Sequence, residues 1–172
     1  MRLFIAVEFS IENQRLLEEW MGRARQQGVR GNFTKKENLH MTLRFLGEQP
    51  DGRPIQRAMR EAAEKCQAFE LLSKGTGTFR DVFWMGFDEE PRLKLLVQKL
   101  GQTLEEQGLG KEERRFQAHM TLCRRFDQGE GGLPDLPKIQ QAVRWITLME
   151  SRRGPNGILQ YHPLCQVTLQ MP

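Results

Sequence analysis

The feature that most constrains the fold is a tetrapeptide that occurs twice. His-Met-Thr-Leu stands at residues 40–43 and again at residues 119–122. Both copies lie in stretches that alternate polar and apolar residues, which is typical of a strand with one face on the core. Side chains two positions apart in a strand point to the same face, so each copy predicts a histidine and a threonine side by side, with methionine and leucine buried opposite. Because each copy also follows a predicted helix, we expect two similar units in the chain.

The segments around the two copies predict which elements these units contain. Strands are expected over residues 2–9, 38–46, 69–73, 82–87, 116–123, 144–150 and 165–169, and helices over residues 11–28, 54–66 and 91–108. Residues 133–143, which include two prolines, leave room for a short helix. The three helices and seven strands predict an α+β fold with duplicated β-α-β units. We expect it to be bilobal, with antiparallel sheets around a central cleft.

The length and composition of the chain fit one globular domain. It has 172 residues, of which 38% are apolar and 28% charged, and large aliphatic residues occur in every segment, which argues against disorder. We expect a single bilobal domain over residues 1–172, with approximate lobes of residues 1–80 and 81–172, and leave open an exchange of strands between them. No apolar run approaches the roughly 20 residues that cross a bilayer, and the first residues lack the pattern of a secretory signal. A cytoplasmic monomer without membrane contact is predicted.

The cysteines and the charged residues indicate which kinds of site and partner the chain can have. The three cysteines, Cys66, Cys123 and Cys165, lie far apart and form no metal-binding spacing with a histidine, so neither a disulfide framework nor a zinc site is predicted. We expect no metal and no cofactor. The net charge is +4, and basic residues come in pairs at positions 35–36, 114–115, 124–125 and 152–153. Such pairs suit a phosphate-bearing partner, but they are also common on an ordinary solvated surface.

The two histidines of the repeated tetrapeptide are the candidate catalytic groups. An imidazole titrates near neutral pH, so one neutral and one charged histidine on either side of a phosphodiester suit general acid–base catalysis. Thr42 and Thr121 would then lie next to His40 and His119 and donate to phosphate oxygens. The third histidine, His162, stands outside any repeated context and is assigned a structural role.

A nearby guanidinium would stabilise negative charge on the phosphate. Arg44, Arg124 and Arg125 are the candidates. Strict alternation along the strand places Arg125, and not Arg124, on the face of His119. Periodicity alone therefore leaves the choice between these two arginines open.

These residues carry a resemblance to a known family. The two motifs resemble the signature of the two-histidine (2H) phosphoesterase superfamily. The resemblance includes Met41 and Leu43 in the first motif and Met120 and Leu122 in the second. The chain as a whole resembles the bacterial and archaeal RNA 2′,3′-cyclic phosphodiesterases, also called 2′-5′ RNA ligases. The matching segments are residues 2–7, the specific block 37–48, residues 84–86, residues 116–124 and residues 161–164.

The resemblance implies hydrolysis of a 2′,3′-cyclic phosphate at an RNA 3′ end to a 2′-phosphomonoester. It makes His40 the proton donor to the departing 3′ oxygen and His119 the proton acceptor that activates water. Thr42, Thr121 and Arg124 would bind the phosphate, and the choice of Arg124 requires the strand to bulge or end near Cys123. In reverse, the same site would join a cyclic phosphate end to a 5′-hydroxyl through a 2′-5′ linkage without ATP. The absence of a P-loop pattern agrees with this.

Two other functions remain open at this stage. A sister 2H phosphoesterase would keep both motifs and act on another nucleotide phosphodiester. A catalytically idle module would use the same cleft only to bind RNA or a nucleotide, although binding alone has no need of two titrating groups. Residues that stack on bases are not identified, since Phe45, Trp84 and Phe116 fit a core equally well.

Overall fold

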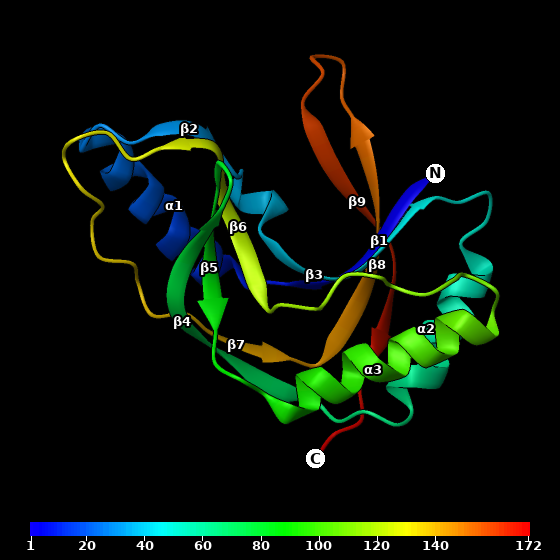
Figure 1. Ribbon diagram of the computed structural model, residues 1–172. Helices are drawn as coiled ribbons and strands as arrows, with labels where there is room; N and C mark the ends of the chain where they lie inside the picture. Colours follow the sequence, from blue (N-terminus) through cyan, green and yellow to red (C-terminus); the bar gives the residue numbers. More distant parts are fainter.

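The computed structural model describes residues 1–172 and contains two antiparallel sheets and three α-helices (Figure 1). The four-stranded sheet has the order β3-β1-β8-β9, and the five-stranded sheet has the order β2-β6-β5-β4-β7. The strands are β1 (Arg2–Glu8), β2 (Arg30–Phe33), β3 (His40–Glu48), β4 (Phe69–Phe79), β5 (Val82–Phe87), β6 (His119–Asp127), β7 (Gln140–Val143), β8 (Trp145–Arg153) and β9 (Leu159–Thr168). The α-helices are α1 (Ile11–Gln26), α2 (Arg53–Ala63) and α3 (Pro91–Glu106), and a 3-10 helix, η1, spans Lys36–Asn38. The predicted α+β class is confirmed.

The helices form where the sequence supplies both an apolar stripe and a start signal. Ser10 caps α1 by accepting a hydrogen bond from the backbone N–H of Asn13, and Pro91 occupies the first turn of α3, where no backbone donor is needed. α1 packs on the five-stranded sheet, where Trp20 stacks on Phe83 with ring centroids 5.9 Å apart. α2 and α3 pack together beside the four-stranded sheet (Figure 1). None of the three α-helices has the length and hydrophobicity needed to cross a lipid bilayer.

Both sheets combine strands from distant parts of the chain. β1 pairs with β3 on one side and with β8 on the other, so the first strand lies in the interior of its sheet. β2, from the first part of the chain, pairs with β6 at the edge of the other sheet. One continuous cluster of 35 buried apolar residues includes side chains from both sheets and all three α-helices. The division into lobes near residue 80 stays a prediction, but neither sheet is built from residues 1–80 or 81–172 alone.

Several predicted boundaries are wrong for reasons of tertiary pairing. Residues 140–143 form strand β7, which pairs with the start of β4, in place of the short helix expected within residues 133–143. β2 was not expected because its four residues include a glycine and are mostly exposed. β4 continues to Phe79 and β9 begins at Leu159, so two exposed hairpins extend well beyond their apolar cores. Pairing with strands that are distant in the sequence, and not local composition, determines the secondary structure of these segments.

The packing of α1 leads to a prediction about stability. Trp20 is fully buried and its indole N–H donates to the backbone carbonyl of Pro134 at 2.9 Å. We expect Trp20→Ala to lower the free energy of unfolding by about 3 to 5 kcal/mol, because it leaves a cavity and an unpaired carbonyl. Trp145→Ala is the matched control, since that side chain is 41% exposed, and its effect should be much smaller. Urea unfolding followed by circular dichroism measures both, and equal losses would contradict the packing described here.

Candidate active site

The same local hydrogen bond holds both motif histidines. Nδ1 of His40 lies 2.7 Å from the backbone oxygen of Asn38, and Nδ1 of His119 lies 2.7 Å from the backbone oxygen of Gln117. A carbonyl oxygen only accepts hydrogen bonds, so Nδ1 is the protonated nitrogen in each neutral ring. This leaves Nε2 of both rings as the nitrogen that can exchange a proton.

Each histidine has its threonine beside it, as the alternation of the strands predicts. Nε2 of His40 lies 2.8 Å from Oγ1 of Thr42. Because this nitrogen lacks a proton in the neutral ring, the hydroxyl of Thr42 donates to it. Thr121 occupies the equivalent position two residues after His119, and its register partner on β5 is Trp84.

A β-bulge at the leucine of each motif changes the alternation that follows. On β3, Ala6 of β1 pairs with Thr42 and the neighbouring Ile5 pairs with Arg44, so Leu43 is an extra residue. On β6, Trp84 pairs with Thr121 and Phe83 pairs with Cys123, so Leu122 is the extra residue. The two strands share the same burial pattern over their first six residues, with two consecutive buried side chains at the bulge.

The bulge on β6 distinguishes the positions of the candidate arginines. Cys123 joins the core, and the exposed Arg124 follows it on the face that carries His119 and Thr121. The bulge near Cys123 that the family resemblance required is therefore present. Arg125 is also exposed, but it has a left-handed backbone with φ 51° and interrupts the regular strand.

The candidate Arg44 is wrong, and the bulge on β3 is the reason. The extra residue turns Arg44 away from His40 toward the core, where it is 7% exposed. Its guanidinium donates to the backbone oxygen of Gly110 at 3.1 Å and lies 3.8 Å from the carboxylate of Glu112. The next residue, Phe45, takes the position on β3 that Arg124 takes on β6 and is 60% exposed. The two motifs therefore present a phenyl ring on one side and a guanidinium on the other.

The two motif strands lie in contact, and their charges affect each other. β3 and β6 belong to different sheets but contact each other. Burial lowers the pKa of His40 below its ordinary value, against the raising effect of its hydrogen bond to Asn38. The positive charges of Arg124 and His119 lower it further. The structure thus brings His119 and Arg124 within electrostatic reach of His40.

Aromatic residues that the sequence did not single out surround His40. Its ring centroid lies 5.1 Å from that of Phe4 and 5.0 Å from that of Tyr161, which meets it edge-on at 88°. Phe4 also lies 6.1 Å from Phe45. Asn38 ties this group to β9, because its side-chain amide donates to the backbone oxygen of Leu159 at 3.1 Å. Tyr161 could not have been found from spacing, since it lies on a strand more than 100 residues away in the sequence.

The surroundings of His119 are more open. The indole of Trp84 is the nearest aromatic group, with its ring centroid 6.0 Å from that of His119. Phe116 lines a groove of about 820 Å³ between β5 and α3, together with Trp84 and Val97. The third histidine, His162, pairs with Glu150 across strands β8 and β9 and belongs to neither motif.

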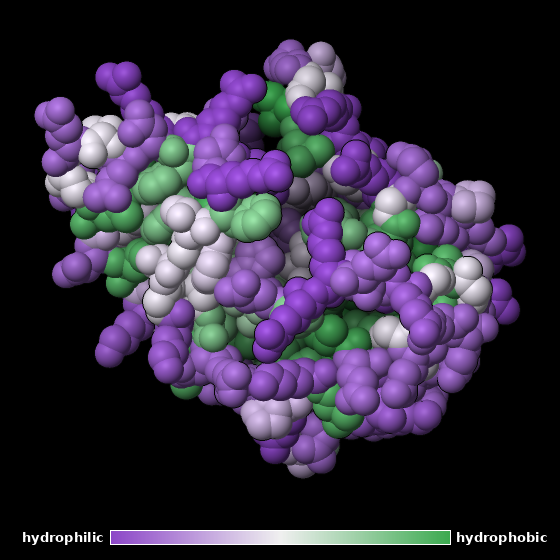
Figure 2. Space-filling model, viewed as in Figure 1, coloured by the Kyte–Doolittle hydropathy of each residue, from purple (hydrophilic) through white to green (hydrophobic).

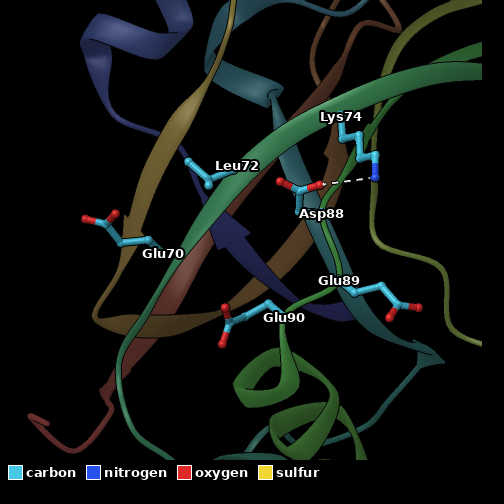
Figure 3. A pocket seen from close by; sticks show the side chains of 6 residues that line it. All are labelled: Glu70, Leu72, Lys74, Asp88, Glu89 and Glu90. Carbon is cyan, nitrogen blue, oxygen red and sulfur yellow. Dashed lines mark ion pairs between the residues drawn. The ribbon is translucent and has the colours of Figure 1, made fainter.

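A second hollow, of about 500 Å³, lies between β4 and the start of α3 (Figure 3). It is lined by Glu70, Leu72, Lys74, Asp88, Glu89 and Glu90. Its one cation, Lys74, lies 3.7 Å from the carboxylate of Asp88, so the lining is acidic and would repel a phosphate. No group of three or more His, Cys, Asp or Glu side chains in the chain is arranged to hold a metal ion.

Comparison with known proteins identifies the family. The family model described as "2'-5' RNA ligase superfamily" matches residues 13–145. The chain belongs to this superfamily. An RNA 2′,3′-cyclic phosphodiesterase of Thermotoga maritima is 30% identical over 170 residues, which are 91% of this chain and 90% of that protein. One of Geobacillus stearothermophilus is 32% identical over 134 residues, which are 74% of this chain but only 42% of that longer protein.

Solved structures of the superfamily share the fold. E. coli LigT in its apo form is 26% identical and superposes with a TM-score of 0.80, covering 98% of this chain and 97% of the LigT chain. The complex of E. coli LigT with 3'-AMP is 27% identical, with a TM-score of 0.78 over 98% and 96% of the two chains. The resemblance stated from the sequence and the 2H phosphoesterase fold that it implied are confirmed.

The charges around His40 lead to a prediction about its titration. We expect the pKa of His40 to lie below the ordinary value of 6.5 in the free protein. Its ring should therefore stay neutral at pH values at which an ordinary histidine is already protonated. Arg124→Ala should raise this pKa, because it removes a positive charge that opposes protonation. Arg125→Ala is the matched control and should change it much less. Titration of the ring nitrogens by NMR measures each pKa, and an equal rise in both variants would mean that Arg125 also faces His40.

Proposed function

We propose that this protein hydrolyses 2′,3′-cyclic phosphates at RNA 3′ ends to 2′-phosphomonoesters, without a metal ion. The observation that carries the proposal is the matched setting of the two motif histidines, each with Nδ1 bound to a backbone oxygen and Nε2 as the nitrogen that can exchange a proton. Two such groups supply both proton transfers that the reaction needs. The curated relatives that are RNA 2′,3′-cyclic phosphodiesterases support the same substrate.

The proton transfers follow from the roles we assign to the histidines. His119, the more open of the two, accepts a proton from water at Nε2 as the water oxygen bonds to phosphorus. The bond between phosphorus and the 3′ oxygen breaks, and His40 donates its Nε2 proton to that oxygen. The lowered pKa of His40 makes its charged form a stronger acid, and a bound phosphate anion favours this charged form.

Thr42, Thr121 and Arg124 bind the phosphate in this proposal. The two hydroxyls donate to the non-bridging oxygens, and the guanidinium of Arg124 stabilises the negative charge that grows on them in the transition state. When the hydroxyl of Thr42 turns to the phosphate, it releases Nε2 of His40 for its proton. The exposed ring of Phe45, backed by the buried Phe4, provides an apolar surface for the nucleoside beside His40.

Two alternatives share this site. A sister phosphoesterase would process another nucleotide phosphodiester better than an RNA end, and a binding module would hold RNA without turnover. Substrate profiling separates the first, and binding that is unchanged between pH 5 and 8 without turnover would establish the second. The monomeric state and cytoplasmic location predicted from the sequence stay predictions.

The histidines provide the direct test of the mechanism. Assayed in excess EDTA on a short RNA ending in a 2′,3′-cyclic phosphate, the protein should give a 2′-phosphate product by ³¹P NMR and a bell-shaped pH–rate profile. His40→Ala and His119→Ala should each slow turnover by about 10² to 10⁴, because each removes one proton transfer. His162→Ala is the control and should keep full activity. Turnover that needs an added divalent metal, or full activity in either motif variant, would overturn the mechanism.

The same displacement with an RNA 5′-hydroxyl in place of water gives a separate prediction. Incubated without ATP, an RNA with a 2′,3′-cyclic phosphate end and a second RNA with a 5′-hydroxyl should yield a small amount of joined product. The linkage should be 2′-5′, and so resist an enzyme that cleaves only 3′-5′ bonds, because the bond to the 3′ oxygen is the one that breaks. His119→Ala should abolish joining along with hydrolysis. A 3′-5′ linkage would contradict the assigned roles.

A further inference from the structure

The loop that joins β4 to β5 presents an exposed aromatic ring next to a cation. Phe79 is 69% exposed, although it is a large apolar residue. The guanidinium carbon of Arg80 lies 5.8 Å from the centre of the Phe79 ring. Arg80 has a left-handed backbone with φ 56°, one of only two non-glycine residues in the chain with positive φ.

This loop is continuous with the candidate active site. Phe79 pairs with Val82 on β5, and Trp84 lies two residues further along the same face. The indole of Trp84 lies flat across β4, because Gly77 opposite it has no side chain that would overlap the ring. An apolar row therefore runs from the hairpin tip to Trp84, which is the aromatic neighbour of His119.

Arginines follow the same row. The backbone oxygen of Asp81, in the loop, accepts a hydrogen bond from the backbone N–H of Phe126 at 2.8 Å, so the hairpin tip lies beside Arg125. None of the ion pairs in the structure includes Arg80, Arg124 or Arg125. The nearest acid along β6, Asp127, accepts from the backbone N–H of Gly129. On the face of the molecule viewed in Figure 1, purple hydrophilic side chains surround areas of green and white surface (Figure 2).

We propose that this hairpin-tip surface, formed by Phe79, Arg80, Trp84 and Arg125, binds the single-stranded RNA that precedes the reacting 3′ end. Unpaired bases stack on aromatic faces whatever their sequence, and guanidiniums contact the phosphates between them. The surface combines both kinds of group and leads to His119. The inference rests on the function proposed above and adds that the protein prefers RNA strands to cyclic mononucleotides.

A double variant tests this surface without touching the histidines. Phe79→Ala with Arg80→Gly removes the ring and the guanidinium, and glycine suits the positive φ at residue 80, so the loop can keep its shape. We expect kcat/KM for a ten-nucleotide RNA with a cyclic phosphate end to fall about tenfold or more, as loss of one stacked base predicts. Hydrolysis of a 2′,3′-cyclic mononucleotide should be unchanged. Ile11→Ala with Arg92→Ala, which removes an exposed apolar and a basic residue on two helices, is the matched control.

A binding measurement keeps this test independent of catalysis. Fluorescence anisotropy of a labelled ten-nucleotide RNA with a 2′-phosphate end should give a Kd about tenfold higher for the double variant than for the wild type, and the difference should shrink as salt is raised. Equal Kd values, no RNA binding by the wild type, or a parallel loss of mononucleotide hydrolysis would overturn the inference. If the wild type binds RNA through this loop but hydrolyses neither substrate, the proposed function fails while the RNA surface stands.

Discussion

The extra residue at the leucine of each motif strand determines which side chains reach the site. Without it, strict alternation would turn Arg124 into the core and bring Cys123 to the face of His119. With it, two consecutive side chains are buried and the next one emerges beside the histidine and threonine. The same displacement on the other strand buries Arg44 and exposes Phe45. A change of one residue in register thus converts two nearly identical strands into one that offers an aromatic ring and one that offers a positive charge.

The duplicated backbone does not produce two equivalent histidines. β9 covers one of them, since Tyr161 lies against His40 and Leu159 holds Asn38, the residue whose backbone oxygen fixes the imidazole. No such strand covers His119, whose aromatic neighbour comes from the adjacent β5. Burial is the main cause of the lowered pKa of His40, so the tetrapeptides are identical but their environments are not. This difference in surroundings supports the separate roles of acid and base that we propose for the two histidines.

The sequence predicted what depends on local periodicity and missed what depends on distant partners. The repeated tetrapeptide, the helical stripes and the alternating strands led to the α+β class and to the family, and both are confirmed. Strict alternation predicted the wrong face for Arg44 and left the choice between Arg124 and Arg125 open. A bulge arises from the pairing of two strands and leaves little signal in the sequence of either strand. β7 and β2 are too short and too exposed for a periodic signal. The ring of Tyr161 meets His40 only through the pairing of β8 with β9, which no local pattern reports.

The position of β1 inside its sheet has a consequence for how the protein is made. Ile5, in β1, pairs on one side with Arg44 and on the other with Leu148. During synthesis the chain must therefore keep this apolar strand unpaired along one edge until β8 has emerged. Tyr161, which covers His40 from β9, is made later still. Until then the candidate site is incomplete, and the unfinished sheet is exposed to chaperones and to aggregation.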